Sequence, residues 1–140
     1  MVNDHVDIAL SSAADGAHLG PEDLSVAGAR KAAGARLLIG ASASTPDAGV
    51  RAEAAGADYL GSGPAYATPL KTEKRVIGPA GVADVTVAVR IPVFAIGGVD
   101  LERIPELKAC GVTRVCAIRS LADTADPEGR ARLFREALEE

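Results

Sequence analysis

Residues 57–71, ADYLGSGPAYATPLK, combine a short apolar strand with a loop rich in glycine and proline. Tyr59 and Leu60 favour a β-strand, and the glycines and proline that follow interrupt it. Thr68 and Lys71 then supply a hydroxyl and a cation. Because parallel α/β proteins bind ligands at the carboxyl ends of their strands, this layout suits an anion. An ordinary strand-to-helix loop with a solvated lysine explains these residues equally well. The residues of the neighbouring loops are needed to distinguish an anion site from such a loop.

Short apolar runs alternate with helical patterns along the chain. Because continuous apolar strands separated by helices are typical of parallel sheets, we expect a parallel sheet covered by helices. Strands are predicted at Ala17–Gly20, Leu37–Ala41, around Tyr59–Leu60, at Val93–Ile96 and at Arg114–Ile118, with a short strand at Val2–Asp4 before them. Helices are predicted at Val6–Ala14, Leu24–Ala33, Thr45–Gly56, Pro79–Val89, Asp100–Gly111 and from Asp126 onward.

The number of predicted strands limits the choice of fold. No linker, low-complexity segment or run of charge divides the 140 residues, so we expect a single domain. Roughly five full strands and a short one are too few for a complete eight-stranded barrel, which needs about 200 residues or more. The pattern therefore predicts either a barrel with strands missing or an unusual parallel sheet.

Composition excludes several classes of function. With 48% hydrophobic but only 3% aromatic residues, the core should consist mainly of Ala, Val, Leu and Ile. A net charge of −4 without a block of Lys and Arg argues against nucleic acid and membrane partners. No apolar run approaches a membrane span and no signal-peptide pattern is visible, so a cytoplasmic location is expected. Cys110 and Cys116 lack metal-ligand partners at the usual spacing, and we expect both to be packing residues.

Polar or glycine-rich residues follow every predicted strand, whereas the segments that lead from a helix into the next strand show no such concentration. We therefore expect the functional residues at the carboxyl ends of the strands. Asp4 and Asp23 follow adjacent strands, so their carboxylates could share one hard cation such as Mg²⁺, or Mn²⁺, which suits the same ligands. Capping of the helices that begin near Val6 and Leu24 explains each aspartate alone equally well. The pair therefore predicts a metal site while leaving the capping explanation open.

A phosphate site is predicted at the last two strand ends. Backbone amides of Gly97 and Gly98 can approach a phosphate, and the Arg119 guanidinium can clamp it. A barrel commonly binds phosphate at these strand ends, so we favour this interpretation over a solvated arginine. His18 lies within a strand and is expected to be a core histidine, and His5 has no nucleophile to activate. No Ser-His-Asp or Cys-His set is visible.

Together, these motifs make the chain similar to the thiamine-phosphate synthase family over essentially its entire length. The matching segments, in order, are VNDHVDIAL, DGAHLGPEDL, GAS, GADYLGSGPAYATPLK, IPVFAIGGV and VCAIRSLADTADP. The resemblance runs from the family's third strand end to its C-terminus. It implies an α/β fold of the TIM (β/α)8-barrel type that is incomplete, with roughly the last five to six β/α units in one domain over residues 1–140.

The resemblance also implies a reaction and a set of site residues. The reaction joins hydroxymethylpyrimidine diphosphate to thiazole phosphate and yields thiamine phosphate and pyrophosphate. Asp4 and Asp23 would hold the cofactor Mg²⁺. The residues implied to bind pyrophosphate are Asn3, Ser42 and Lys71, with Ser42 and Lys71 catalytic, and those implied on the thiazole-phosphate side are Thr68, Gly98, Ile118 and Arg119.

Some features depart from the family pattern. The family has further strands before the Asn-Asp motif, one of them carrying an arginine and a lysine that grip the pyrophosphate and pyrimidine, and we expect them to be missing. Pro21, Leu70 and Arg119 replace the usual glutamine, threonine and serine. The expected partners are phosphorylated small molecules, with a second copy or a partner chain completing the barrel.

Two alternative functions remain open on the sequence. One is a thiazole tautomerase-like enzyme, which shares the fold but does not need the metal and diphosphate residues. The other is a catalytically inactive, phosphate-binding barrel fragment that needs a partner chain. The synthase is favoured because the metal and diphosphate residues occur together, namely Asn3, Asp4, Asp23, Ser42 and Lys71.

Overall fold

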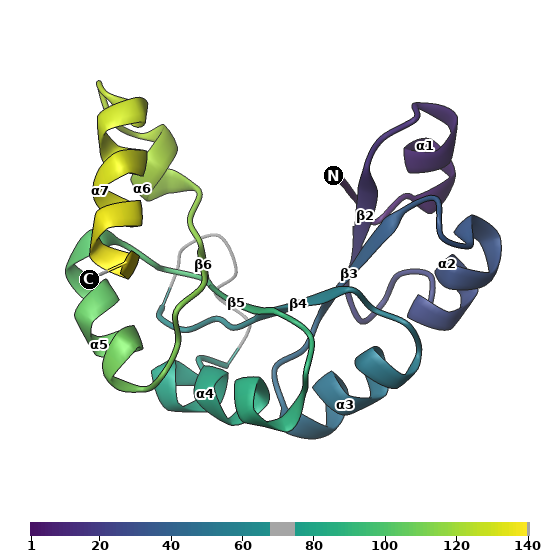
Figure 1. The fold of residues 1–140 in the computed structure, drawn as a ribbon, viewed down its shortest axis with the longest axis horizontal. Helices are drawn as coiled ribbons and strands as arrows, with labels where there is room; N and C mark the ends of the chain where they lie inside the picture. Colours follow the sequence, from purple (N-terminus) through teal and green to yellow (C-terminus); the bar gives the residue numbers. More distant parts are fainter. Residues whose placement is uncertain (68–74, 140) are drawn as a thin grey trace.

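The structure, a computed structural model, describes residues 1–67 and 75–139 and contains one six-stranded parallel sheet. Each strand pairs with its neighbour in sequence order. Figure 1 shows the strands along an arc, which forms half of a barrel wall and confirms the predicted fold. The strands are β1 (Val2–Asn3), β2 (Gly16–Leu19), β3 (Leu38–Ser42), β4 (Tyr59–Ser62), β5 (Val93–Ile96) and β6 (Val115–Cys116).

Helices lie along the outer, convex side of this arc (Figure 1). They are α1 (Val6–Ser11), α2 (Val26–Ala33), α3 (Pro46–Ala54), α4 (Gly78–Ala88), the 3₁₀ helix η2 (Leu101–Arg103), α5 (Ile104–Ala109), α6 (Arg119–Ala122) and α7 (Pro127–Glu139). The predicted start of α3 is confirmed. Thr45 Oγ1 accepts a hydrogen bond from Ala48 N at 3.3 Å, and Pro46 occupies the first turn. Gly34 ends α2, as predicted.

The last predicted strand differs from the observed one. The sequence predicts a strand over Arg114–Ile118, but β6 contains only two residues. Ile118 is the N-cap of α6, and the Leu121 and Ala122 amides already donate to its carbonyl. The chain therefore turns into a helix where its apolar pattern suggested a longer strand.

Successive side chains of each strand point alternately to the helices and to the inside of the arc. Ile39, Leu60 and Ala95 point toward the helices and are fully buried. Their strand neighbours face the inside of the arc, because successive side chains in a strand point to opposite faces. His18 and Ser42 belong to this inner set, which leaves them accessible at the strand ends.

Two clusters of buried side chains lie on the helical side of the sheet. One lies under β2 and β3 and is formed by Val6, Ala9, Ala17, Leu19, Ala29, Ala33, Leu37 and Ile39. The other lies under β4 to β6 and includes Leu60, Val82, Val85, Ile104, Leu107 and Phe134. As the composition predicts, most of these residues are Ala, Val, Leu and Ile.

The cysteines do not belong to either cluster. Cys110 and Cys116 are both exposed thiols, so the prediction that they are packing residues is wrong. Cys110 lies at the C-terminal cap of α5, and Cys116 faces the inside of the arc on β6. An apolar run around Cys116 suggested burial, but it could not show which face of the strand the thiol would occupy.

Candidate functional site

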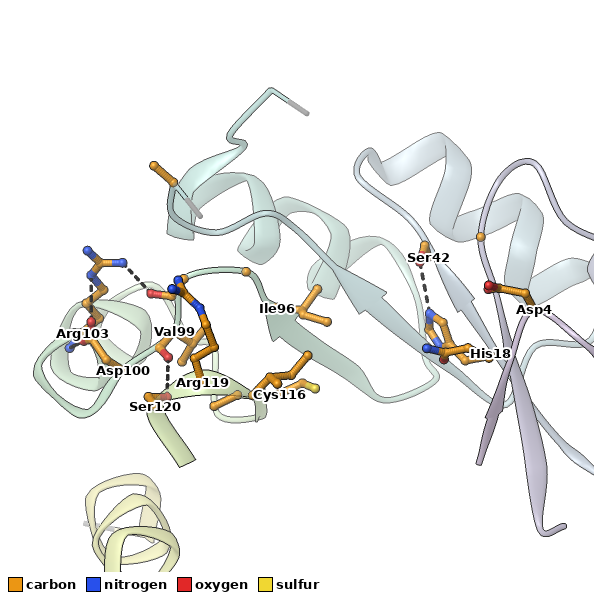
Figure 2. Close-up of a pocket in the computed structure, with 17 residues that line it drawn as sticks. Asp4, His18, Ser42, Ile96, Val99, Asp100, Arg103, Cys116, Arg119 and Ser120 are labelled. Carbon is orange, nitrogen blue, oxygen red and sulfur yellow. Dashed lines mark hydrogen bonds and ion pairs between the residues drawn. The ribbon is translucent and has the colours of Figure 1, made fainter. Parts of the chain in front are cut away.

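A cavity of about 500 Å³ lies at the carboxyl ends of the strands. In Figure 2, Asp4, His18 and Ser42 gather at one end of it, Arg103, Arg119 and Ser120 gather at the other, and Ile96 and Cys116 lie between them. Its lining residues are Asn3, Asp4, His18, Gly20, Ser42, Ala67, Ile96, Gly97, Gly98, Val99, Asp100, Arg103, Cys116, Ala117, Ile118, Arg119 and Ser120. The predicted location of the site is therefore where the structure has a cavity.

Asp4 follows β1 in an unusual backbone conformation. Its φ is 67°, in the left-handed region that aspartate tolerates better than most residues, and its amide donates to the His18 carbonyl at 2.9 Å. The predicted alternative, that Asp4 caps α1, is wrong because the cap is His5 and no side chain bonds the helix start. Within the described residues the Asp4 carboxylate makes no hydrogen bond or ion pair, so its oxygens are available to a ligand.

Asp23 is tied to the end of β2. Its Oδ2 accepts a hydrogen bond from Gly20 N at 2.6 Å, and Gly20 lines the cavity together with Asp4. The capping alternative is wrong here too, because α2 begins at Val26 and its cap is Ser25 Oγ, which accepts from Gly28 N at 3.1 Å. Asp23 does not itself line the cavity, but its carboxylate is held at the end of β2, the strand that pairs with β1.

The donor set of this end is chemically compatible with the predicted Mg²⁺ only if other ligands complete the shell of the ion. Among residues 1–67 and 75–139, no group of three or more His, Cys, Asp and Glu side chains could hold a metal ion. Magnesium does not require such a cage, because it commonly takes one or two carboxylates and completes its octahedral shell with water and phosphate oxygens. Asp4 and Asp23, which follow the paired strands β1 and β2, carry the two carboxylates that such a partial site would use.

His18 was predicted to be a core histidine, and this prediction is wrong. The side chain is half-buried on the inner face and lines the cavity. Its Nδ1 lies 3.0 Å from Tyr59 Oη and its Nε2 lies 3.1 Å from Ser42 Oγ. Burial raises the pKa of the Tyr59 phenol, with a smaller contribution from the nearby Cys116. The only feature of the sequence that pointed to this contact was the position of His18 near the end of its strand, where alternation places the side chain on the inner face of the sheet.

The opposite end of the cavity carries two arginines in different states. Arg103 Nη1 donates to the Gly98 carbonyl, its Nε lies 3.5 Å from Asp100 Oδ2, and its guanidinium lies 4.4 Å from the centre of the Tyr66 ring. The Arg119 side chain is exposed and makes no hydrogen bond or ion pair within the part of the chain that the structure describes. The first arginine is held in the fold, and the second has all its donors available to an anion.

Gly98 owes its identity to packing as well as to its place in the cavity. Its φ is 64°, and an added Cβ would lie 2.8 Å from the Ala67 carbonyl oxygen and 2.9 Å from Tyr66 Cβ. The segment that follows β4 is bonded to this turn through Tyr66 N, which donates to Gly97 O at 3.0 Å. A glycine is thus required here by the close approach of the two loops.

The cavity brings together most of the residues that the sequence selected. These are Asn3, Asp4, Ser42, Gly98, Ile118 and Arg119, with Asp23 attached through Gly20. Thr68 and Lys71 lie outside the described residues. Sequence reasoning missed Arg103, which has the form of an ordinary surface arginine on η2 and gave no signal of its bond to the cavity wall.

No helix among the described residues is long and apolar enough to span a membrane.

Comparison with known families finds a match to the family described as thiamine monophosphate synthase over residues 1–121.

Curated relatives carry a consistent name. A thiamine-phosphate synthase of Gloeobacter violaceus is 44% identical over 138 residues, covering 99% of this chain and 40% of that protein. The thiamine-phosphate synthase of Caldivirga maquilingensis is 44% identical over 140 residues, covering 100% of this chain and 68% of that protein. The chain thus spans about two fifths of the length of some relatives and about two thirds of others.

Solved structures give the same result for the fold. A thiamine phosphate pyrophosphorylase from Pyrococcus furiosus superposes with a TM-score of 0.88 at 36% identity, over 99% of this chain and 66% of that chain. A 3-hexulose-6-phosphate synthase superposes with a TM-score of 0.73 at 24% identity, over 94% of this chain and 66% of that chain, a likeness of fold alone.

Proposed function

The chain belongs to the thiamine monophosphate synthase family, and from this we propose that it serves the transferase reaction of that family. The substrates are hydroxymethylpyrimidine diphosphate and thiazole phosphate, and the products are thiamine phosphate and pyrophosphate. One observation carries the proposal: within the described residues, a single cavity has the unpaired Asp4 carboxylate at one end, with Asp23 bonded to Gly20 of the cavity wall, and the unpaired Arg119 guanidinium at the other end. Such a cavity suits two anionic substrates, one bound with a metal ion and one bound directly.

The end at β1 to β3 would receive the diphosphate. Asp4 and Asp23 would hold Mg²⁺, which when bound offsets the negative charge of the pyrophosphate leaving group. Asn3 and Ser42 line the cavity beside them and carry polar groups able to donate hydrogen bonds to the diphosphate oxygens. Lys71, outside the described residues, would add a mobile cation.

The end at β5 and α6 would receive the thiazole phosphate. The Arg119 guanidinium has a planar set of donors suited to phosphate oxygens, and Gly98 and Ile118 also line the cavity. Thr68 would add a hydroxyl on this side. The apolar Ile96 between the two ends leaves room for the uncharged rings of both substrates to meet.

The reaction then requires little acid-base chemistry. The bond from the pyrimidine methylene carbon to the diphosphate oxygen breaks, and its electron pair leaves with pyrophosphate. The thiazole nitrogen donates its lone pair to the resulting methylene cation and forms the new carbon–nitrogen bond. Positioning of the two substrates and stabilisation of the leaving group account for most of such a rate enhancement, so no strong general base is needed in the cavity.

We propose further that strands from a second copy or a partner chain complete the barrel. The described sheet ends at β1 and β6, and on its inner side Met1 is 56% exposed and Leu38 is 53% exposed. Unpaired strand edges and exposed apolar side chains favour association with another sheet. Analytical ultracentrifugation of the purified chain checks this point, and a stable monomer without partner would contradict it.

The proposed reaction is tested by incubating the purified 140-residue chain with both substrates and measuring thiamine phosphate, first with Mg²⁺ and then after chelation. We expect product that disappears on chelation and returns when Mg²⁺ is added back. Asp7→Asn removes an exposed carboxylate on α1 and should keep full activity, so it is the control for substitutions of Asp4 and Asp23 in the same assay. A cooperatively folded sample that forms no product would contradict the proposal and favour the inactive, partner-dependent alternative.

A further inference from the structure

Three residues on three neighbouring strands form one row across the inner face of the sheet. In the strand register, His18 on β2 lies opposite Gly40 on β3, and Gly40 lies opposite Tyr59 on β4. The central position of the row has no side chain. A Cβ added to Gly40 would overlap the Tyr59 ring, so the tyrosine side chain lies directly over this glycine.

The gap at Gly40 allows a contact that skips a strand. Tyr59 crosses β3 and places its Oη 3.0 Å from His18 Nδ1, with the two ring centroids 5.5 Å apart. Phe94 on β5 packs edge-on against the Tyr59 ring, at 5.8 Å between centroids. The far nitrogen of the imidazole, Nε2, lies 3.1 Å from Ser42 Oγ at the end of β3. Tyr59, His18 and Ser42 are therefore linked in one chain of hydrogen bonds.

We propose that Tyr59 and His18 are positioning residues that orient the Ser42 hydroxyl, so that its proton points to the bound diphosphate. This inference rests on the proposed function, because that function assigns an anion to Ser42. It goes beyond it by giving a role to two residues that need not touch the anion.

The direction of the chain follows from the chemistry of the ligand. Diphosphate oxygens are acceptors, so Ser42 must use its single proton to donate to them. Ser42 Oγ is then an acceptor toward His18, and Nε2 must carry a proton. In the neutral imidazole this leaves Nδ1 as an acceptor, and Tyr59 Oη must donate to it. Burial raises the pKa of Tyr59, which keeps its phenol protonated and able to act as that donor.

The first test reads the imidazole directly and needs no ligand, because a phenol donates to an imidazole nitrogen more readily than it accepts from one, so Tyr59 favours the same tautomer before the anion binds. The chain has two histidines, so ¹⁵N NMR of the ring nitrogens gives two sets of signals, and a His5→Asn variant assigns them. At about pH 8, where an ordinary histidine is neutral, His18 should be the Nε2–H tautomer. Tyr59→Phe should remove this preference. A wild-type His18 in the Nδ1–H tautomer, or one that does not respond to Tyr59→Phe, would overturn the inference.

The second test measures the effect on an anion. Binding of inorganic pyrophosphate in the presence of Mg²⁺ is measured by calorimetry for the wild type, Tyr59→Phe, Ser42→Ala and the double variant. We expect Tyr59→Phe to weaken binding about three- to tenfold, the effect of one hydrogen bond. In the Ser42→Ala background it should have almost no further effect. Tyr66→Phe, which removes the other tyrosine hydroxyl of the chain, should leave pyrophosphate binding unchanged.

The outcomes separate this inference from the proposed function. Equal weakening by Tyr59→Phe in both backgrounds would mean that Tyr59 acts by packing, and the proposed orientation of Ser42 by Tyr59 and His18 would be wrong. A wild-type chain that binds no pyrophosphate would contradict the proposed function. The NMR experiment would then decide on its own whether Tyr59 and His18 form the proposed hydrogen bond.

Discussion

The two ends of the cavity present opposite charges and are built in different ways. At the β1 to β3 end, strand register fixes the side chains, Asp4 directly follows β1, and the Asp23 carboxylate is bonded to Gly20 N at the end of β2. At the β5 to α6 end, a glycine turn and a four-residue helix replace the strands, and Arg103 donates a hydrogen bond to the Gly98 carbonyl of the turn. The difference teaches that the acidic end depends on the sheet, whereas the basic end depends on loop contacts.

Each end also lies over its own part of the core. The cluster around Leu19 and Ile39 supports the strands of the acidic end, and the cluster around Leu60 and Ile104 supports those of the basic end. The two ends can therefore be perturbed separately. If they bind different substrates, a substitution at one end should leave binding at the other nearly unchanged.

The largest effect is expected at the acidic end. Asp4→Asn should raise the Mg²⁺ concentration needed for half-maximal thiamine phosphate formation by more than about 100-fold, above the usual cost of losing an outer-shell partner. Asp23→Asn should act in the same direction while keeping an oxygen for Gly20 N. The measurement is the rate across a magnesium titration. An unchanged magnesium requirement in both variants would remove the metal from this end.

A somewhat smaller effect is expected from Arg119→Ala at the basic end. Loss of a charge-assisted hydrogen bond to phosphate should raise KM for thiazole phosphate about 10- to 100-fold. KM for the pyrimidine diphosphate should change less than about threefold. Arg132→Ala on α7, which removes a surface ion pair with Glu128, is the matched control. The opposite pattern of KM values would exchange the two substrates between the ends.

Arg103→Gln sharpens the claim that loop contacts hold the basic end. Removing the guanidinium that bonds Gly98 O and covers Tyr66 should lower the free energy of unfolding by about 1 kcal/mol, because the group is partly exposed. Asp100→Asn, which keeps an acceptor for Arg103 N, should cost less than about 0.5 kcal/mol. Urea unfolding measures both. Equal stability of wild type and Arg103→Gln would contradict this role.

The smallest effect concerns Tyr66, whose hydroxyl donates to Glu106 Oε2 at 2.9 Å. Burial, followed by this hydrogen bond and the Glu106 charge, raises the pKa of Tyr66 to about 12 from 10.0. Between these values the unfolded chain loses the phenolic proton and the folded chain keeps it, so ionisation favours unfolding. Stability from this group is complete below about pH 10 and is lost as the pH rises toward 12. Unfolding of the wild type and Tyr66→Phe compared across this range should show a smaller loss in the variant.

Sequence reasoning predicted the parts of the molecule that follow from local pattern. The apolar run Val93–Ile96 is β5, and inward polar residues at strand ends, such as Asp4 and Ser42, do line one cavity. It failed where position depends on a distant strand. His18 was assigned to the core because its contacts, Tyr59 and Ser42, lie on β4 and β3 and are brought to it by register and by the gap at Gly40.

The most direct measurement is a crossed binding experiment on the two ends. Calorimetry would compare inorganic pyrophosphate with Mg²⁺ and thiazole phosphate as ligands of the wild type, Asp4→Asn and Arg119→Ala. Our account predicts that Asp4→Asn weakens only pyrophosphate and that Arg119→Ala weakens only thiazole phosphate. If both variants weakened the same ligand and spared the other, the cavity would have a single anion site, and the division into two ends would be contradicted.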